Sequence, residues 1–98
     1  MIKAVIIDLD GTAVDLPAES EISPAMSLAV KSALAAGIKI CAATGRSVNF
    51  ARPLIQGLNL KDPCVVSGGA RVVDPVTEKE LWGLDIPRKA LEEVFAIV

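Results

Sequence analysis

Three short apolar runs, none of them alternating with polar residues, constrain the fold of this chain more than any other feature. They span residues 3–7, 38–43 and 64–66 and consist mostly of Val, Ile, Ala and Cys. A continuous apolar run of this length is typical of a strand covered on both faces, as in a parallel sheet. The runs therefore predict the buried strands of a parallel sheet.

Helical patterns fill the intervals between these runs. Ser23 and Pro24 predict a helix start, with Ser as the N-cap and Pro at the first helical position, and Gly37 predicts the end of that helix. A second helical repeat begins at Val48, and we expect Pro53 to kink this helix or to move its start later. The order strand, helix, strand, helix, strand predicts a Rossmann-like, three-layer α/β/α fold with helices on both faces of the sheet.

The rest of the chain has a different character. Residues 9–21 contain Gly, Pro and acidic residues without a helical period, which predicts a loop or small flap. Residues 71–74 and 79–82 flank a turn and predict a β-hairpin. A last helix, opening at Ile86–Pro87, runs into apolar Ile97–Val98 without a C-terminal cap. We therefore expect the chain to be a truncated part of a longer protein.

Composition excludes several classes of protein. The 98 residues suffice for one domain, and a net charge of -2 gives no electrostatic reason to expect nucleic acid or an anionic membrane as partner. We expect no signal peptide, because Asp8 stops the first apolar run, and no window approaches the ~20 apolar residues of a membrane span. We expect a cytoplasmic protein, with Cys41 and Cys64 as reduced core residues. The absence of histidine excludes Ser-His-Asp triads and imidazole metal sites within this chain.

Small, hydroxyl and acidic residues stand where each apolar run ends, at 8–12, 44–47 and 67–69. In an open α/β sheet, ligands bind outside the carboxyl ends of the strands. Asp8 and Asp10 are two residues apart in extended chain and leave the backbone on the same side, where a hard cation such as Mg²⁺ would relieve their repulsion. The alternative is an N-capping pair of aspartates on a solvated turn.

The second of these segments suits phosphate. The Thr44 hydroxyl and the backbone N–H groups near Gly45, at the start of a helix, form an anion site. Alternatively, Thr44 or Ser47 merely caps that helix. Arg46 could contact substrate, but pairing with acids at the surface is the favoured interpretation. Residues 67–69 either let substrate approach the backbone or form only a turn.

Two motifs carry a resemblance to a known family. Residues 8–12, Asp-Leu-Asp-Gly-Thr, resemble the first signature motif of the haloacid dehalogenase superfamily, and residues 43–47 resemble its second. With residues 67–70 and the hairpin, the pattern is similar to the Cof-type branch, which includes sugar-phosphate and phosphoglycolate phosphatases. The resemblance implies a partial core domain over residues 1–83 and, over 84–98, the start of a cap domain or a truncated helix.

The resemblance also implies roles for individual residues. Asp8 would be the nucleophile that forms an aspartyl-phosphate, and Asp10 the general acid and base. Mg²⁺ would be held at Asp8 and Asp10, through the carboxylate of the first and the backbone carbonyl of the second. The Leu9 amide, the Thr44 hydroxyl and the Gly45 amide would bind the phosphoryl oxygens.

The function implied is a Mg²⁺-dependent phosphohydrolase that acts on a small phosphorylated metabolite such as a sugar phosphate. The family's third-motif lysine and fourth-motif acids do not occur in these residues, so we expect the chain to be inactive alone. The alternative is a non-catalytic metal- or phosphate-binding module, or an interaction module completed by a partner chain. A receiver domain is disfavoured because Ser67 follows the third strand, where its phosphorylated aspartate would stand. A homo-oligomer is compatible with the sequence, which does not decide it.

Overall fold

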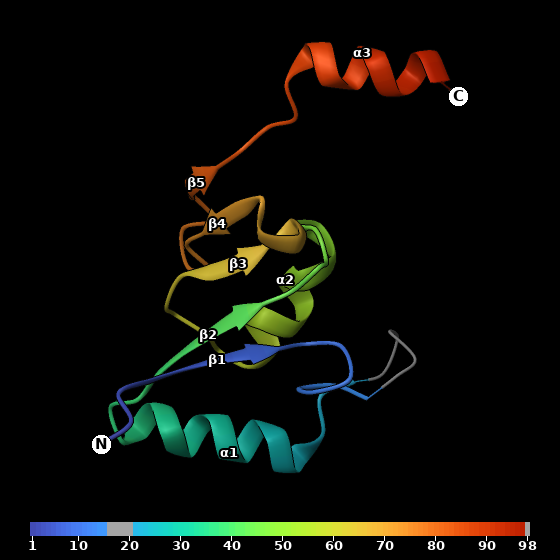
Figure 1. Ribbon diagram of the computed structural model, residues 1–98. Helices are drawn as coiled ribbons and strands as arrows, with labels where there is room; N and C mark the ends of the chain where they lie inside the picture. Colours follow the sequence, from blue (N-terminus) through green and yellow to red (C-terminus); the bar gives the residue numbers. More distant parts are fainter. Residues whose placement is uncertain (16–20, 98) are drawn as a thin grey trace.

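The computed structural model describes residues 1–15 and 21–97, so part of the loop predicted over 9–21, and Val98, lie outside the described residues. In chain order (Figure 1) the elements are β1 (Ala4–Asp8), α1 (Pro24–Ala35), β2 (Lys39–Ala43), α2 (Val48–Gly57), β3 (Cys64–Val66), the 3₁₀ turn η1 (Ser67–Gly69), β4 (Arg71–Val73), β5 (Glu80–Gly83) and α3 (Arg88–Ile97).

One mixed sheet organises the chain, with its strands in the order β1-β2-β3-β4-β5. The first three strands are parallel, with Asp8 beside Ala43 and Ala43 beside Val65. The predicted hairpin is confirmed: β4 runs antiparallel to β3, and β5 runs antiparallel to β4. The carboxyl ends of β1, β2 and β3 point to the same side of the molecule (Figure 1), as a Rossmann-like α/β fold requires.

Local capping sets the ends of the first helix as predicted. The Ser23 hydroxyl accepts a hydrogen bond from the Met26 amide at 3.1 Å, and Pro24 occupies the first turn of α1. Gly37, with φ +83°, follows the helix in a left-handed conformation that a residue with a side chain rarely adopts. By contrast, α2 contains Pro53 and still begins at Val48, so the proline does not delay its start.

A single face of the sheet carries the core. Burial alternates along the strands, and the helices contribute Val30 from α1 and Ala51 and Ile55 from α2 to the same cluster. Both crossovers step in one direction across the sheet, and the right-handed rule then puts α1 and α2 on one face. The described residues thus build two of the three expected layers. The inward strand residues are Val5, Ile7, Ile40, Ala42, Cys64, Val66 and Val73.

The opposite face of the sheet is apolar but is covered by neither α1 nor α2. Ile6 is 69% exposed there, and Cys41 and Val65 are only partly buried. Both cysteines are free, and they lie on opposite faces of the sheet: Cys64 is buried in the core, whereas Cys41 is on the uncovered face. Burial raises the pKa of both thiols.

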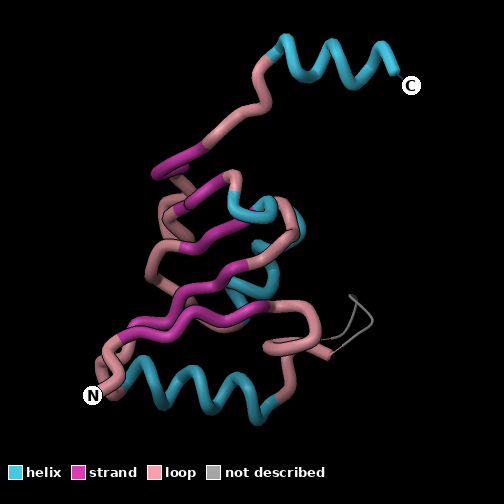
Figure 2. Tube along the Cα trace, in the orientation of Figure 1, coloured by secondary structure: helices cyan, strands magenta, loops and turns pink. Residues whose placement is uncertain are grey.

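The last helix stands away from the sheet at the end of an extended connection (Figure 2). No side chain of α3 is buried in the described part of the chain. Arg71 fixes the beginning of the connection: it donates to the Leu84 carbonyl at 3.0 Å and forms ion pairs with Glu80 and Asp85. Within residues 1–15 and 21–97, no helix has the length and apolar character needed to cross a membrane.

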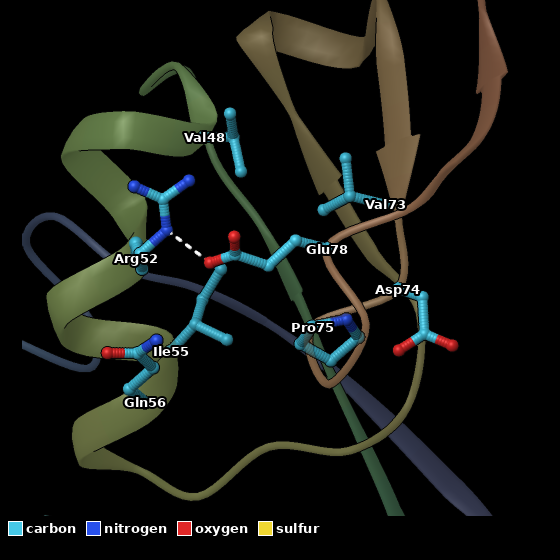
Figure 3. Close-up of a pocket in the computed structure, with 8 residues that line it drawn as sticks. All are labelled: Val48, Arg52, Ile55, Gln56, Val73, Asp74, Pro75 and Glu78. Atoms are coloured by element: carbon cyan, nitrogen blue, oxygen red, sulfur yellow. Dashed lines mark hydrogen bonds and ion pairs between the residues drawn. The ribbon is translucent and has the colours of Figure 1, made fainter.

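The turn of the hairpin packs against α2 (Figure 3). Arg52 of α2 forms an ion pair with Glu78, and the Asp74 carboxylate accepts from the Val76 amide at 2.8 Å to hold the turn. The crevice between them encloses about 10 Å³, room for roughly one water molecule. This contact joins the hairpin to the core but offers no ligand site.

We predict that Ile55→Ala lowers the free energy of unfolding by about 2–5 kcal/mol, because it empties space in the core where Ile55 is 3% exposed. Leu28→Ala, on the exposed side of α1, is the matched control and should change it by less than about 0.5 kcal/mol. Urea denaturation of the complete protein measures both. Equal losses for the two variants would contradict the assignment of the core to the space between the helices and the sheet.

Candidate active site

The three segments that follow β1, β2 and β3 come together at the carboxyl edge of the sheet. An open hollow of about 450 Å³ lies at this edge, between the last residue of β1 and the loops after β2 and β3. Candidate residues from all three segments therefore share one site. The hollow is lined by Asp8, Ala43, Thr44, Gly45, Val65, Gly68 and Gly69.

Asp8 is the last residue of β1, and its neighbour Leu9 has the opposite orientation. The Asp8 side chain lines the hollow, whereas Leu9 is fully buried in the core. This alternation explains why a leucine separates two aspartates: the buried side chain anchors the strand end and turns both carboxylates outward. The Leu9 amide donates to Asp8 Oδ1 at 2.8 Å, so the amide predicted to hold phosphate is bonded to the candidate nucleophile.

A tight turn follows the two acids. Gly11 has φ +79°, and its amide donates to the Val14 carbonyl at 2.7 Å, while the Val14 amide donates to the Leu9 carbonyl at 2.9 Å. Ala13 and Val14 are buried and tie the turn to the core. No helix begins within residues 9–15, so the alternative in which the two aspartates cap a helix finds no support there.

Thr44 is the one polar residue in the buried set of the described chain, with 5% exposure. Its Oγ1 accepts from the Arg46 amide at 3.0 Å, while its own amide donates to the Val65 carbonyl at 2.9 Å. The Ser47 side chain makes no capping hydrogen bond to α2. Thr44 therefore holds the turn after β2, and Gly45, with open space beside it, lines the hollow.

The favoured interpretation of Arg46 was an ion pair with surface acids. Arg46 does pair with an acid, but that acid is the candidate catalytic residue Asp10. Its Nε donates to Asp10 Oδ2 at 2.8 Å, and Nη2 donates to Oδ1. These hydrogen bonds lower the pKa of the Asp10 carboxyl from its ordinary value; partial burial opposes the shift, and the Arg46 charge adds to it. The sequence feature that places Arg46 near the site is its position two residues after Thr44, in the same loop.

The segment after β3 is fastened to the loop after β2. The Ser67 amide donates to the Arg46 carbonyl at 2.7 Å, and the Gly68 amide donates to the Thr44 carbonyl at 3.1 Å. Ser67 has φ 54°, a left-handed conformation that costs a residue with a side chain roughly 1–2 kcal/mol. Backbone strain held in this way is common where a segment borders a site, and Gly68 and Gly69 do line the hollow.

The residues partly fit a magnesium ion. Mg²⁺ favours one or two carboxylates, with phosphate oxygens and waters completing an octahedron. The Asp8 carboxylate lines the hollow, whereas both side-chain oxygens of Asp10 are bonded to Arg46. Among the described residues, no three His, Cys, Asp or Glu side chains are grouped as a metal site. Asp8 is thus the carboxylate available to a cation.

Together these features define an α/β protein with an acidic site at the carboxyl edge of a parallel sheet. The sequence matches the model of the haloacid dehalogenase-like hydrolases over residues 5–98. The chain belongs to this family, which confirms the resemblance carried by the motifs at residues 8–12 and 43–47.

Solved structures share the fold. A phosphatase of the haloalkanoate (HAD) enzyme superfamily, BT1666 from Bacteroides thetaiotaomicron, is 26% identical with a TM-score of 0.87, over 99% of this chain and 35% of its own. The HAD subclass IIB sugar phosphatase BT4131 is 30% identical with a TM-score of 0.76, over 96% of this chain and 36% of its own. The chain thus spans about a third of the length of these proteins.

A third structure, a haloacid dehalogenase-like hydrolase from B. subtilis, is 24% identical with a TM-score of 0.82, over 98% of this chain and 33% of its own, and shows the fold alone. No curated protein matches the sequence.

We predict that Gly11→Ala lowers the free energy of unfolding by about 1–2 kcal/mol, because alanine is strained at φ +79°. Added carbon at this position meets open space, so the loss is conformational. Gly45→Ala is the matched control: it also faces open space but has no positive φ, and we expect a smaller effect. Urea denaturation of the complete protein checks this, and a larger loss at Gly45 would contradict it.

Proposed function

We propose that this chain supplies the nucleophile and the acid–base residue of a cytoplasmic, Mg²⁺-dependent phosphomonoester hydrolase of the Cof type. Its substrate would be a small phosphorylated metabolite such as a sugar phosphate. The observation that carries the proposal is the hollow lined by Asp8 together with residues of the loops after β2 and β3, while Asp10, two residues further on, is held by Arg46. Family membership and the phosphatases among the structural neighbours support it.

Two displacements at phosphorus would complete the reaction. An Asp8 oxygen attacks phosphorus and the bond to the leaving oxygen breaks, while Asp10 gives that oxygen a proton. Water then attacks phosphorus, Asp10 takes its proton, and the bond between Asp8 and phosphorus breaks to release inorganic phosphate. The ion pair with Arg46 favours ionised Asp10, the form that accepts the water proton. A bound phosphate dianion favours the protonated form that the first step needs.

The loops supply neutral donors for the phosphoryl oxygens. Thr44 and Gly45 line the hollow, so the Gly45 amide and the Thr44 hydroxyl would be the donors, and the hydroxyl can donate its hydrogen while its oxygen accepts from Arg46. The Leu9 amide contacts Asp8 Oδ1, so it would join them once Asp8 turns toward phosphorus. Fixed donors of this kind stabilise charge that develops on the phosphoryl oxygens.

A magnesium ion would be held by the Asp8 carboxylate and the backbone carbonyl of Asp10. When bound, the ion neutralises charge between the nucleophile and the phosphate. Because both Asp10 side-chain oxygens are bonded to Arg46, the carbonyl of that residue is the ligand we assign to it.

The remaining groups of such a site would come from outside these 98 residues. The family's lysine and its distal acids are missing from this sequence, and the solved relatives are nearly three times as long. We propose that residues 1–83 are part of the catalytic core, that 84–98 begin a cap, and that the chain is inactive by itself. The missing groups also keep a second function open, a metal- or phosphate-binding module completed by a partner chain.

We predict that Asp8→Asn in the complete protein abolishes Mg²⁺-dependent hydrolysis of p-nitrophenyl phosphate, because an amide oxygen cannot act as the nucleophile. The fold should persist, since Asp8 is exposed. The matched control is Asp62→Asn, before β3 at the other end of the sheet, which should keep full activity. An Asp8→Asn variant with near-normal turnover would refute the mechanism. Phosphate binding without turnover by the unsubstituted protein would favour the binding module.

We predict a milder effect for Thr44→Val, which removes one neutral phosphate contact and the acceptor of the Arg46 amide. The loss in kcat/KM should be about tenfold, in line with about 1–1.5 kcal/mol for one hydrogen bond. Thr44→Ser keeps the hydroxyl and serves as the control. Steady-state kinetics of both variants test this, and a loss for Thr44→Ser as large as that for Thr44→Val would contradict the assignment of the effect to the hydroxyl.

A further inference from the structure

We propose that Arg46 is a positioning residue that fixes the orientation of the Asp10 carboxylate and couples it to the phosphate-binding loop. The inference rests on the proposed function, because it assigns Arg46 a part in the acid–base work of Asp10. It assigns Arg46 neither a contact with substrate nor a purely surface role.

The side-chain contacts form a two-point clamp. Nε and Nη2 of Arg46 each bind a different oxygen of Asp10, so the plane of the carboxylate is fixed as well as its position. The two side chains are 17% and 30% exposed, so the pair is partly shielded from solvent. Nη1 of Arg46 donates to the Phe50 carbonyl at 3.2 Å, which anchors the guanidinium to the first turn of α2.

The backbone of Arg46 is anchored as firmly as its side chain. Its amide donates to Thr44 Oγ1 at 3.0 Å, and its carbonyl accepts from the Ser67 amide at 2.7 Å. Arg46 therefore contacts the loops after β1, β2 and β3 at once. Through Arg46, Thr44 at the hollow is thus linked to Asp10 by two successive hydrogen-bonded contacts.

The direction of the guanidinium separates this role from substrate binding. Nε and Nη2 face Asp10 and Nη1 faces the Phe50 carbonyl, whereas the hollow is lined by Asp8 and by residues that do not include Arg46. A residue that acts through Asp10 should affect proton transfer to the leaving oxygen and leave the affinity for phosphate unchanged. A residue that binds the phosphate should do the reverse.

The leaving group provides the test. An alkyl phosphate needs a proton on its leaving oxygen, whereas p-nitrophenolate leaves without one. In the complete protein we expect Arg46→Ala to lower kcat/KM for an alkyl phosphate by about 10²-fold, within the range of general acid catalysis, and kcat/KM for p-nitrophenyl phosphate by less than about threefold. This parameter reports the steps up to departure of the leaving group, so it excludes the later attack of water, in which Asp10 serves both esters alike. Inhibition by inorganic phosphate should be unchanged. In an Asp10→Asn background, Arg46→Ala should add no further loss.

Two matched variants complete the experiment. Arg46→Lys keeps one charge but not the two-point geometry, so it should recover part of the alkyl-phosphate activity. Arg52→Ala removes another ion-paired arginine at α2 and should leave both activities unchanged. Circular dichroism shows which variants are folded, and if neither Arg46→Ala nor Arg46→Lys folds, the role of Arg46 is structural and the proposal is overturned.

Other results also overturn it in distinguishable ways. Equal losses for both esters together with weaker phosphate inhibition would make Arg46 a substrate contact, with the phosphatase function intact. A further loss from Arg46→Ala in the Asp10→Asn background would show that Arg46 does not act through Asp10. No Mg²⁺-dependent hydrolysis by the unsubstituted protein would reject the proposed function, and this inference with it.

Discussion

The parallel pairing of β1, β2 and β3 is the constraint on which the rest of the structure depends. It places Asp8 beside Ala43 and Ala43 beside Val65, so the three strands end at one edge. The segments that follow are distant in sequence, yet they border one hollow because of this register. Slipping a strand by one residue would exchange its inward and outward side chains, so burial of Leu9 and Thr44 fixes the site as well as the core.

Polar contacts then give the two acids at this edge of the sheet different environments. Two carboxylates two residues apart would repel, and the structure resolves the conflict by giving them different surroundings. Asp10 is neutralised by Arg46, whereas Asp8 remains on the open side. A pair of acids in unlike environments is suited to two different roles, one as nucleophile and one as proton carrier.

Much of this was predictable from the sequence, because the signals are local. Ser23, Pro24 and Gly37 act through their own backbone geometry, and the apolar runs identify the strands. The partner of Arg46 was not predictable, since it lies 36 residues away and the pairing exists only once β1 and β2 are side by side. Nor did the pattern reveal that α1 and α2 share one face, because that depends on the direction in which the strands are added.

The two cysteines give the molecule a pair of internal reporters with different neighbours. Cys64 lies beneath the helices, whereas Cys41, on the adjacent strand, faces the side of the sheet that neither α1 nor α2 covers. The rates at which an alkylating reagent modifies the two thiols would therefore report two different structural changes. Modification of Cys64 requires the helices to separate from the sheet. Modification of Cys41 becomes slower when another part of the protein, or a partner, covers the other face of the sheet.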